Sequence, residues 1–280
     1  MIILRESIEI KNWVESQRNS GQTIGFAPTM GALHQGHISL VNQSKQENDL
    51  TIVSIFVNPT QFNNLQDLKK YPRTEKKDAE MLEEAGVDVL FLPTVEEMYP
   101  QETESQPFDF EGLENQMEGK FRPGHFDGVA TIVRKFFEII QPNRAYFGEK
   151  DFQQLRIIEE LALKIPFNIE IIPVEIMREL DGLAMSSRNV RLSEEMRLEA
   201  PKIYRILKNA KRYFEDNSIE ATEKFVMEAF AQTKLKLEYF EIADEKTLIS
   251  MTEKSKDKKP RAFVAAFADE IRLIDNLGLY

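Results

Sequence analysis

Two of the three histidines in the chain, His34 and His37, lie in one short segment together with Gly31 and Gly36. Each imidazole can donate a hydrogen bond to a phosphate oxygen, and a protonated imidazole adds positive charge. The glycines let the main chain approach a ligand closely. The spacing alone leaves two other interpretations open: a pair of metal ligands, for which no third ligand is obvious nearby, and ordinary surface residues.

The surroundings of this segment favour phosphate. A strand-like run over residues 23–27 precedes the segment, and a helical pattern begins near Gly36. In an open parallel sheet, ligands bind at the carboxyl ends of the strands. A helix that begins there offers free main-chain N–H groups and a partial positive charge. We therefore predict a phosphate-binding loop over residues 28–37.

Two further clusters carry groups suited to phosphate. Gly148 follows another strand-like run, and Lys150 can place a point charge on a phosphate. Asp151 comes next and has an alternative role as the cap of the following helix. Residues 186–188 combine two hydroxyls with the guanidinium of Arg188, a compact set of donors. The alternative for this last cluster is a polar linker between domains.

Amide side chains form two more clusters. Asn58 and Gln61 follow the strand-like run over residues 51–57, and Gln154 lies just inside the helix after Lys150. Uncharged amides suit the hydroxyls and carboxylates of a small substrate. Because most of these clusters follow strand-like runs, we expect them to converge on one edge of the sheet.

The elements that would position these residues alternate along the chain. Strand-like runs that read as buried on both faces cover residues 23–27, 51–57, 87–92, 145–147 and 169–176. Helical patterns cover residues 37–48, 74–85, 126–140 and 151–163, and the third of these has its apolar residues on one face. This alternation predicts a parallel sheet with crossover helices on both faces, an α/β, Rossmann-like domain over residues 1–176.

The pattern changes after residue 176. Residues 193–234 are mostly helical, with Ser193 as a plausible N-cap, and strand-like runs follow at residues 236–242 and 261–268. The lysine-rich stretch at residues 253–260 is predicted to be a solvated loop. We therefore expect a smaller α+β lid domain over residues 177–280. The polar residues 101–124 are either a mobile flap or an interface loop.

Composition narrows the function further. The 280 residues carry a net charge of -11, which gives no general attraction to nucleic acid or to an anionic bilayer. The absence of cysteine excludes disulfides, a thiolate nucleophile and a thiolate metal site. The sequence contains no apolar run of about 18 residues, so we expect no membrane span. The N-terminus lacks the pattern of a secretory signal. We expect a cytoplasmic protein.

Taken together, the motifs resemble a known family. The segment His34-Gln35-Gly36-His37 resembles the His-x-Gly-His signature of the nucleotidyltransferase superfamily. The chain is more closely similar to the pantothenate synthetases, the AMP-forming ligases of pantoate and β-alanine. Motifs of that family are matched, in the same order, at residues 51–62, 71–74, 122–129, 147–154 and 181–189.

The resemblance implies a reaction in two steps. Pantoate attacks the α-phosphate of ATP to give pantoyl adenylate and pyrophosphate, and β-alanine then attacks the acyl carbon to give pantothenate and AMP. The implied catalytic residues are His37, at the α-phosphate as a proton donor, with His34, Lys150 and Arg188. The implied ATP-binding residues are Met30, Gly31, Ala32, Leu33, His34, Gln35, Gly36, His37, Gly148, Glu149, Lys150, Asp151, Met177, Met185, Ser186, Ser187 and Arg188.

The resemblance also implies substrate, metal and partner contacts. Gln61, Gln154 and Asn58 would bind pantoate, with Gln61 also near β-alanine, and Asp78 would help to place Mg²⁺ through water. The family is typically dimeric through its N-terminal domain. A carboxylate that attacks a phosphate is an anion approaching an anion, so positive groups and hydrogen-bond donors at the phosphates lower the barrier.

Three other functions remain to be separated from the ligase. A nucleotidylyltransferase that releases a stable adenylylated product would share the histidine segment but would not need the amide clusters. A tRNA synthetase or RNA-binding module is disfavoured by the chain length and the acidity. A non-catalytic nucleotide sensor would not need every position expected for chemistry to be filled.

Overall fold

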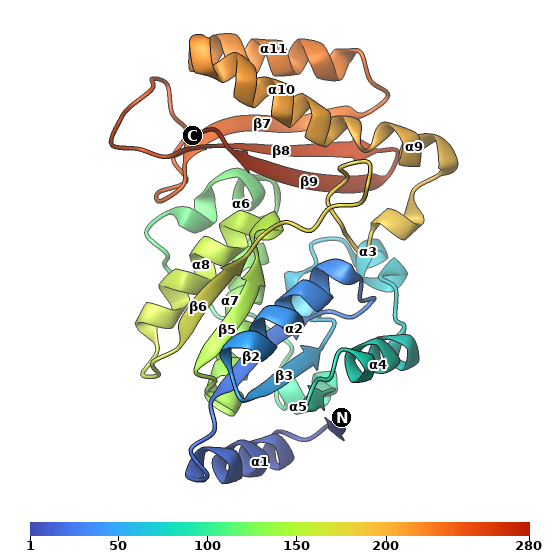
Figure 1. The fold of residues 1–280 in the computed structure, drawn as a ribbon, viewed down its shortest axis with the longest axis vertical. Coiled ribbons are helices and arrows are strands. Elements are labelled where there is room, and N and C mark those ends of the chain that lie inside the picture. Colours follow the sequence, from blue (N-terminus) through green and yellow to red (C-terminus); the bar gives the residue numbers. More distant parts are fainter.

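Six strands form one parallel sheet in the computed structural model, which describes residues 1–280 apart from the side chain of Leu65 (Figure 1). The strand order is β1-β4-β3-β2-β5-β6, and every neighbouring pair is parallel. The predicted parallel sheet is confirmed. The strands are β1 (Ile2–Leu4), β2 (Ile24–Thr29), β3 (Leu50–Ile55), β4 (Val89–Phe91), β5 (Arg144–Gly148) and β6 (Glu170–Val174).

Helices flank this sheet and link its strands. They are α1 (Ser7–Asn19), α2 (Gln35–Glu47), α3 (Leu65–Lys70), α4 (Glu75–Glu84), α5 (Val95–Met98), α6 (Met117–Phe121), α7 (His125–Ile140) and α8 (Phe152–Lys164). The four helices expected in this part correspond to α2, α4, α7 and α8, with ends that differ by one or two residues. The sequence interpretation did not include β1 or α1.

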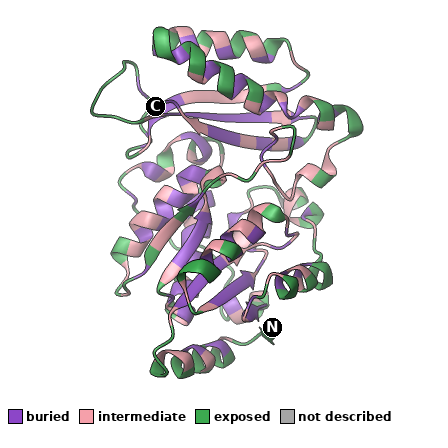
Figure 2. Cartoon of the chain, viewed as in Figure 1, coloured by how far each residue is buried: buried purple, intermediate pink, exposed green. Residues whose placement is uncertain are grey.

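The central strands are buried on both faces. On one face Phe26 of β2 and Phe91 of β4 pack against Phe136 of α7, with ring centroids 5.6 Å and 6.2 Å apart. Their neighbours along the strands, Ala27 and Leu90, belong to a second core on the other face. Figure 2 shows these strands as buried, with exposed positions on the outer sides of the helices. Near-continuous apolar runs are typical of such a sheet.

The strand expected at residues 169–176 departs from this pattern. It forms β6 at the edge of the sheet, where Glu170 and Pro173 are exposed. The expectation that this run is buried on both faces is therefore wrong, because an edge strand has a neighbouring strand on one side only. Its apolar residues Ile171 and Ile172 are partly buried.

The order of the strands creates a crevice beside β2. This strand pairs with β3 on one side and with β5 on the other. The connection after β2 leads to β3, whereas the connection after β5 leads to β6, on the opposite side. The loops that follow β2 and β5 therefore diverge at the carboxyl edge. Ligands bind at such a switch point in open α/β sheets. The predicted phosphate loop and the cluster around Lys150 follow these two strands.

A second, antiparallel sheet follows in the chain. It has the order β7-β8-β9, with β7 (Lys236–Asp244), β8 (Pro260–Ala268) and β9 (Ile271–Gly278), and it packs with α9 (Glu194–Glu199), α10 (Lys202–Asp216) and α11 (Ile219–Ala231). Ser193 does cap α9, since its Oγ accepts the Met196 N–H at 3.3 Å. Residues 253–259 form an exposed loop between β7 and β8, as predicted. The sequence interpretation missed β9.

The boundary between the two predicted domains, at residues 176 and 177, stays a prediction. The last strand of the first sheet ends at Val174, and α9 begins at Glu194. Within the polar residues 101–124, Phe110, Leu113 and Met117 are buried in the larger core. Glu118 of α6 forms a salt bridge with Arg272 of β9 at 2.7 Å, so this segment also connects the two sheets. None of the described helices has the length and apolarity that a membrane span requires.

Candidate active site

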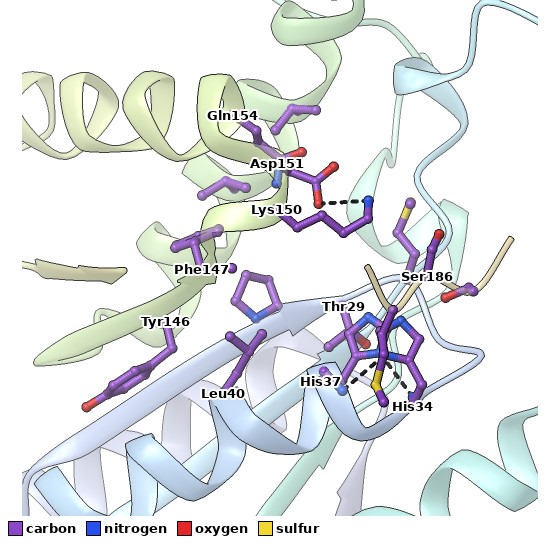
Figure 3. A pocket seen from close by; sticks show the side chains of 18 of the residues that line it. Thr29, His34, His37, Leu40, Tyr146, Phe147, Lys150, Asp151, Gln154 and Ser186 are labelled. Atoms are coloured by element: carbon purple, nitrogen blue, oxygen red, sulfur yellow. Dashed lines mark hydrogen bonds and ion pairs between the residues drawn. The ribbon is translucent and has the colours of Figure 1, made fainter. Parts of the chain in front are cut away.

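The histidine segment forms the start of α2 through a reciprocal pair of hydrogen bonds. His34 is the N-cap, and its Nδ1 accepts the Gly36 N–H at 3.1 Å. Nδ1 of His37 accepts the His34 N–H at 3.2 Å. The two rings lie 4.1 Å apart (Figure 3). Because each Nδ1 accepts a hydrogen bond, the single proton of each neutral ring resides on Nε2, which is a donor.

Both imidazoles are held in the neutral form. Burial, followed by the charge of Lys150, lowers the pKa of His34 to about 4. Burial, followed by the neighbouring His34 and then Lys150, lowers the pKa of His37 to about 3. A positively charged histidine was one expectation for this loop, and it is wrong near neutral pH. The rings act as uncharged donors, and positive charge must come from lysine, arginine and the helix N-terminus.

Asp78 of α4 fixes the loop from behind. Its Oδ2 accepts the Ala32 N–H and its Oδ1 accepts the Leu33 N–H, each at 2.8 Å. The hydroxyl of Thr74 donates to the same Oδ1 at 3.0 Å. Ala32 has a φ of 50°, in the left-handed region, so the carboxylate stabilises a strained turn. Asp78 is 1% exposed, so its carboxylate serves here as an anchor of the loop, and its role in placing Mg²⁺ through water stays a prediction.

A cavity of about 220 Å³ opens between the loops that follow β2 and β5. Figure 3 shows Lys150 and Asp151 across this cavity from His34 and His37. Most of the sequence-predicted residues meet here. Those that line the cavity are Met30, His34, Gly36, His37, Asn58, Gln61, Gly148, Lys150, Asp151, Gln154, Met177, Met185, Ser186, Ser187 and Arg188.

Five predicted ATP-binding residues do not line this cavity. Gln35 is exposed, and Leu33 is buried in the core on the α2 face of the sheet. Gly31 and Ala32 belong to the turn that Asp78 anchors, and the Ala32 carbonyl accepts the Ser187 hydroxyl at 3.0 Å. Glu149 is directed toward Arg261 of β8, at 4.0 Å. In this structure these residues shape the loop or connect the two sheets.

The amide side chains form one wall. The Gln61 side-chain amide lies 2.8 Å from Sδ of Met30, and its Oε1 accepts from Asn58 at 3.3 Å. Asn58 is 1% exposed, and its Oδ1 accepts the Tyr99 hydroxyl at 2.7 Å. Asn58 and Gln61 are therefore held by their neighbours, and both line the cavity together with Gln154.

Two side chains behind this wall hold the main chain of Gln61. Nδ1 of His125 lies 2.8 Å from the Gln61 carbonyl, to which it donates, and Arg122 donates to the same oxygen at 3.3 Å. Burial, followed by the charge of Arg122, lowers the pKa of His125 to about 3. The third histidine thus supports the amide wall and does not reach the cavity lining.

An apolar floor completes the cavity, and the sequence interpretation did not include it. The floor consists of Leu40, Phe56, Val129, Ile132, Val133 and Phe136. Three-and-four spacing along α7 revealed an apolar face, but such a face is ordinarily read as core. Only the three-dimensional arrangement shows that part of this face borders a cavity. A wall of amides above an apolar floor suits a small acid with an aliphatic body.

The chain is similar to one known protein family over nearly its whole length. The family described as pantoate-beta-alanine ligase matches residues 2–278. A pantothenate synthetase of Flavobacterium psychrophilum is 52% identical over 281 residues, which cover 100% of each chain. A pantothenate synthetase of Christiangramia forsetii is also 52% identical, over 100% of this chain and 99% of the relative.

Solved structures give the same result. The crystal structure of pantothenate synthetase from Thermus thermophilus matches with a TM-score of 0.92 and 40% identity, over 100% of both chains. The pantoate-beta-alanine ligase from Francisella tularensis, complexed with beta-gamma ATP and beta-alanine, matches with a TM-score of 0.80 and 38% identity. That match covers 100% of this chain and 98% of the other.

Proposed function

The chain belongs to the pantoate–β-alanine ligase family, and from this premise we propose that the central cavity joins pantoate to β-alanine at the expense of ATP. The observation that carries the proposal is the meeting, in one cavity, of a phosphate-binding helix start with an amide wall over an apolar floor. A phosphate site alone needs no amide wall. The enzyme forms pantoyl adenylate and pyrophosphate first, and pantothenate and AMP second.

In the first step a carboxylate oxygen of pantoate attacks the α-phosphorus of ATP, and the bond to the pyrophosphate oxygen breaks. Negative charge grows on the phosphate oxygens. His34 and His37 each offer an Nε2–H donor at the start of α2, while Lys150 and Arg188 add positive charge. With a pKa of about 3, His37 acts as a hydrogen-bond donor and keeps its proton.

Positioning supplies the rest of the first step. Gln61 and Gln154 bind the hydroxyls and the carboxylate of pantoate, and the apolar floor contacts its aliphatic part. Ser186 donates to a phosphate oxygen beside Arg188, whereas the one hydroxyl proton of Ser187 is donated to the Ala32 carbonyl, which ties this segment to the phosphate loop. In the second step the free amine of β-alanine attacks the acyl carbon, the bond to AMP breaks, and a proton leaves the nitrogen. This step depends mainly on orientation.

Magnesium enters the proposal as a partner of the ATP phosphates. Among the described residues, no group of three or more His, Asp or Glu side chains is arranged to hold a metal ion. Mg²⁺ is commonly bound through substrate phosphates and water with little help from protein ligands. When bound in this way, Mg²⁺ neutralises phosphate charge.

A homodimer and a cytoplasmic location complete the proposal. The strand β1 lies at the edge of the sheet, where Ile2 and Ile3 are each 48% exposed. This apolar edge supports a contact between N-terminal domains, which sedimentation velocity would detect as a dimer. A chain without cysteine fits a reducing compartment.

Withholding β-alanine tests the ligase against a nucleotidylyltransferase. With ATP and pantoate only, the ligase should release about one pyrophosphate per active site and then stop, because the adenylate stays bound. Adding β-alanine should start steady turnover, with equal amounts of AMP and pantothenate. Continued release of pyrophosphate without the amine would favour the transferase.

A further inference from the structure

One carboxylate binds two arginines where the two parts of the chain meet. Oδ2 of Asp67, on α3, accepts from Nη2 of Arg188 at 2.7 Å, and Oδ1 accepts from Nη1 of Arg191 at 2.9 Å. Both arginines lie in the segment that leads into α9, beside α3 in Figure 1. The side chains are 28%, 28% and 19% exposed, so solvent screens these pairs only partly.

The carboxylate reaches Arg188 from outside the active site. Arg188 lines the central cavity and also a second cavity of about 370 Å³ between the two sheets. Asp67 and Arg191 line only the second cavity. Arg188 is therefore part of the wall that separates the two spaces, and Asp67 holds it from the side away from the histidines.

The charges of the cluster suit this arrangement. Arg188, Arg191 and Asp67 together carry a net charge of about +1, the exposed Glu270 lies farther out at 4.0 Å from Arg191, and without the Asp67 carboxylate the two guanidiniums would repel each other. A guanidinium has five N–H donors, so the Nη2 contact leaves others for a phosphate. Burial alone would raise the pKa of Asp67, but hydrogen bonds and charges from Arg188 and Arg191 hold it below the usual value. The carboxylate is ionised at neutral pH.

The same contact steadies the segment between the amide wall and α4. Asp67 follows Gln61 by six positions and precedes Tyr71, whose buried ring lines the central cavity. The Arg188 guanidinium also lies over this ring, 5.8 Å from its centroid. A side chain tied to an anion and an aromatic ring has few other positions available.

We propose that Asp67 is a positioning residue for adenylation, which sets the guanidinium of Arg188 against the triphosphate of ATP without touching the reactants. Arg191 balances the charge of this carboxylate and keeps the cluster electropositive. The proposal rests on the function proposed above. It predicts that Asp67 affects the binding of ATP through Arg188 and has little effect on the binding of pantoate.

Steady-state kinetics of Asp67→Asn test the proposal. The substitution keeps the size of the side chain and removes its charge. The KM for ATP should rise about 10- to 100-fold, the loss expected for one charge-assisted contact. The KM for pantoate should change less than about twofold. General loosening of residues 58–71 would instead raise both constants, because Asn58 and Gln61 lie in the same segment, and that result would overturn the proposal.

A double substitution tests whether Asp67 acts through Arg188. If it does, Arg188→Ala combined with Asp67→Asn should be no slower than Arg188→Ala alone, within about twofold. If the loss in the double variant equals the product of the two single losses, the two residues act independently, and the proposal is contradicted. If Asp67→Asn does not fold, Asp67→Glu and Asp67→Gln give the same comparison, since they differ only in charge. Asp67→Glu should then bind ATP at least about tenfold more tightly than Asp67→Gln.

Glu270→Gln is the matched control. Glu270 pairs with Lys70 at 3.1 Å and lies 4.0 Å from Arg191, but its side chain is 66% exposed and these pairs are worth little. Its kinetic constants should stay within about twofold of the parent enzyme, and an increase in the KM for ATP like that of Asp67→Asn would overturn the proposal. If the parent enzyme shows no pantoate-dependent activity, the proposed function fails. If the parent enzyme is active and Asp67→Asn matches it, only the role of Asp67 fails.

Discussion

Nδ1 of His37 accepts the main-chain N–H of His34 at 3.2 Å, and this bond determines which ring nitrogen can serve a ligand. With Nδ1 occupied, the proton of the neutral ring is on Nε2. The same arrangement holds for His34, whose Nδ1 accepts the Gly36 N–H. The signature His-x-Gly-His is thus a helix cap as well as a pair of donors, and the glycine lets the first ring reach the main chain.

Removal of His37 should slow the reaction and leave the fold intact. His37→Ala deletes one donor to the α-phosphate, and we expect kcat for pantothenate formation to fall about 10²- to 10³-fold. His37→Gln keeps an N–H donor and should retain more activity than alanine. Circular dichroism should show the parent helix content in both variants. Full activity of His37→Ala would remove this residue from the mechanism.

The histidines should not titrate near neutral pH. Their pKa values are lowered to about 4, 3 and 3 for His34, His37 and His125, so each ring is neutral above pH 5 and takes up a proton only below it. Proton–carbon NMR of the imidazole groups should show all three ring signals unchanged between pH 5.5 and 8. A ring that titrates near pH 6.5, the ordinary value, would show that burial does not control its charge.

Asp78→Asn tests whether Asp78 anchors the phosphate loop or helps to place Mg²⁺. The amide would direct an N–H₂ group at one of two main-chain N–H groups, leaving a buried donor unpaired, which costs about 1–3 kcal/mol. We expect a lower melting temperature and a higher KM for ATP. The concentration of Mg²⁺ that gives half-maximal activity should stay the same. A large increase in that concentration, with unchanged stability, would instead support the role in placing Mg²⁺.

Two adjacent glutamines should behave differently. Gln154 lines the cavity, and Gln154→Ala should raise the KM for pantoate about 10-fold or more with little change in stability. Gln153 faces away and bonds the Glu118 N–H and the Leu113 and Gln116 carbonyls. Gln153→Ala should lower stability instead. Equal effects of the two changes on the KM for pantoate would contradict this assignment.

Sequence reasoning located the site because the large sheet is parallel. Clusters after separate strands, such as Gly36 and Lys150, must meet where the carboxyl ends of those strands meet. The short β1, the helix α1 and the strand β9 were missed, since their patterns are brief or mixed and tertiary contacts decide their structure.

The charge and partners of individual side chains could not be predicted in this way. The neutral state of His37 depends on burial, which a linear sequence does not show. The role of Asp78 depends on a bend in a loop 45 residues away in the chain. Asp67 lies within a charged, unremarkable stretch, and its partners Arg188 and Arg191 are more than 120 residues distant.

The central claim is that this cavity makes an acyl adenylate from pantoate. Exchange of labelled pyrophosphate into ATP, measured without β-alanine, tests it most directly, because the first step must run backward for label to enter ATP. We predict exchange that requires pantoate and falls at least about 10²-fold in His37→Ala. A folded protein that binds ATP but shows no pantoate-dependent exchange would contradict the account.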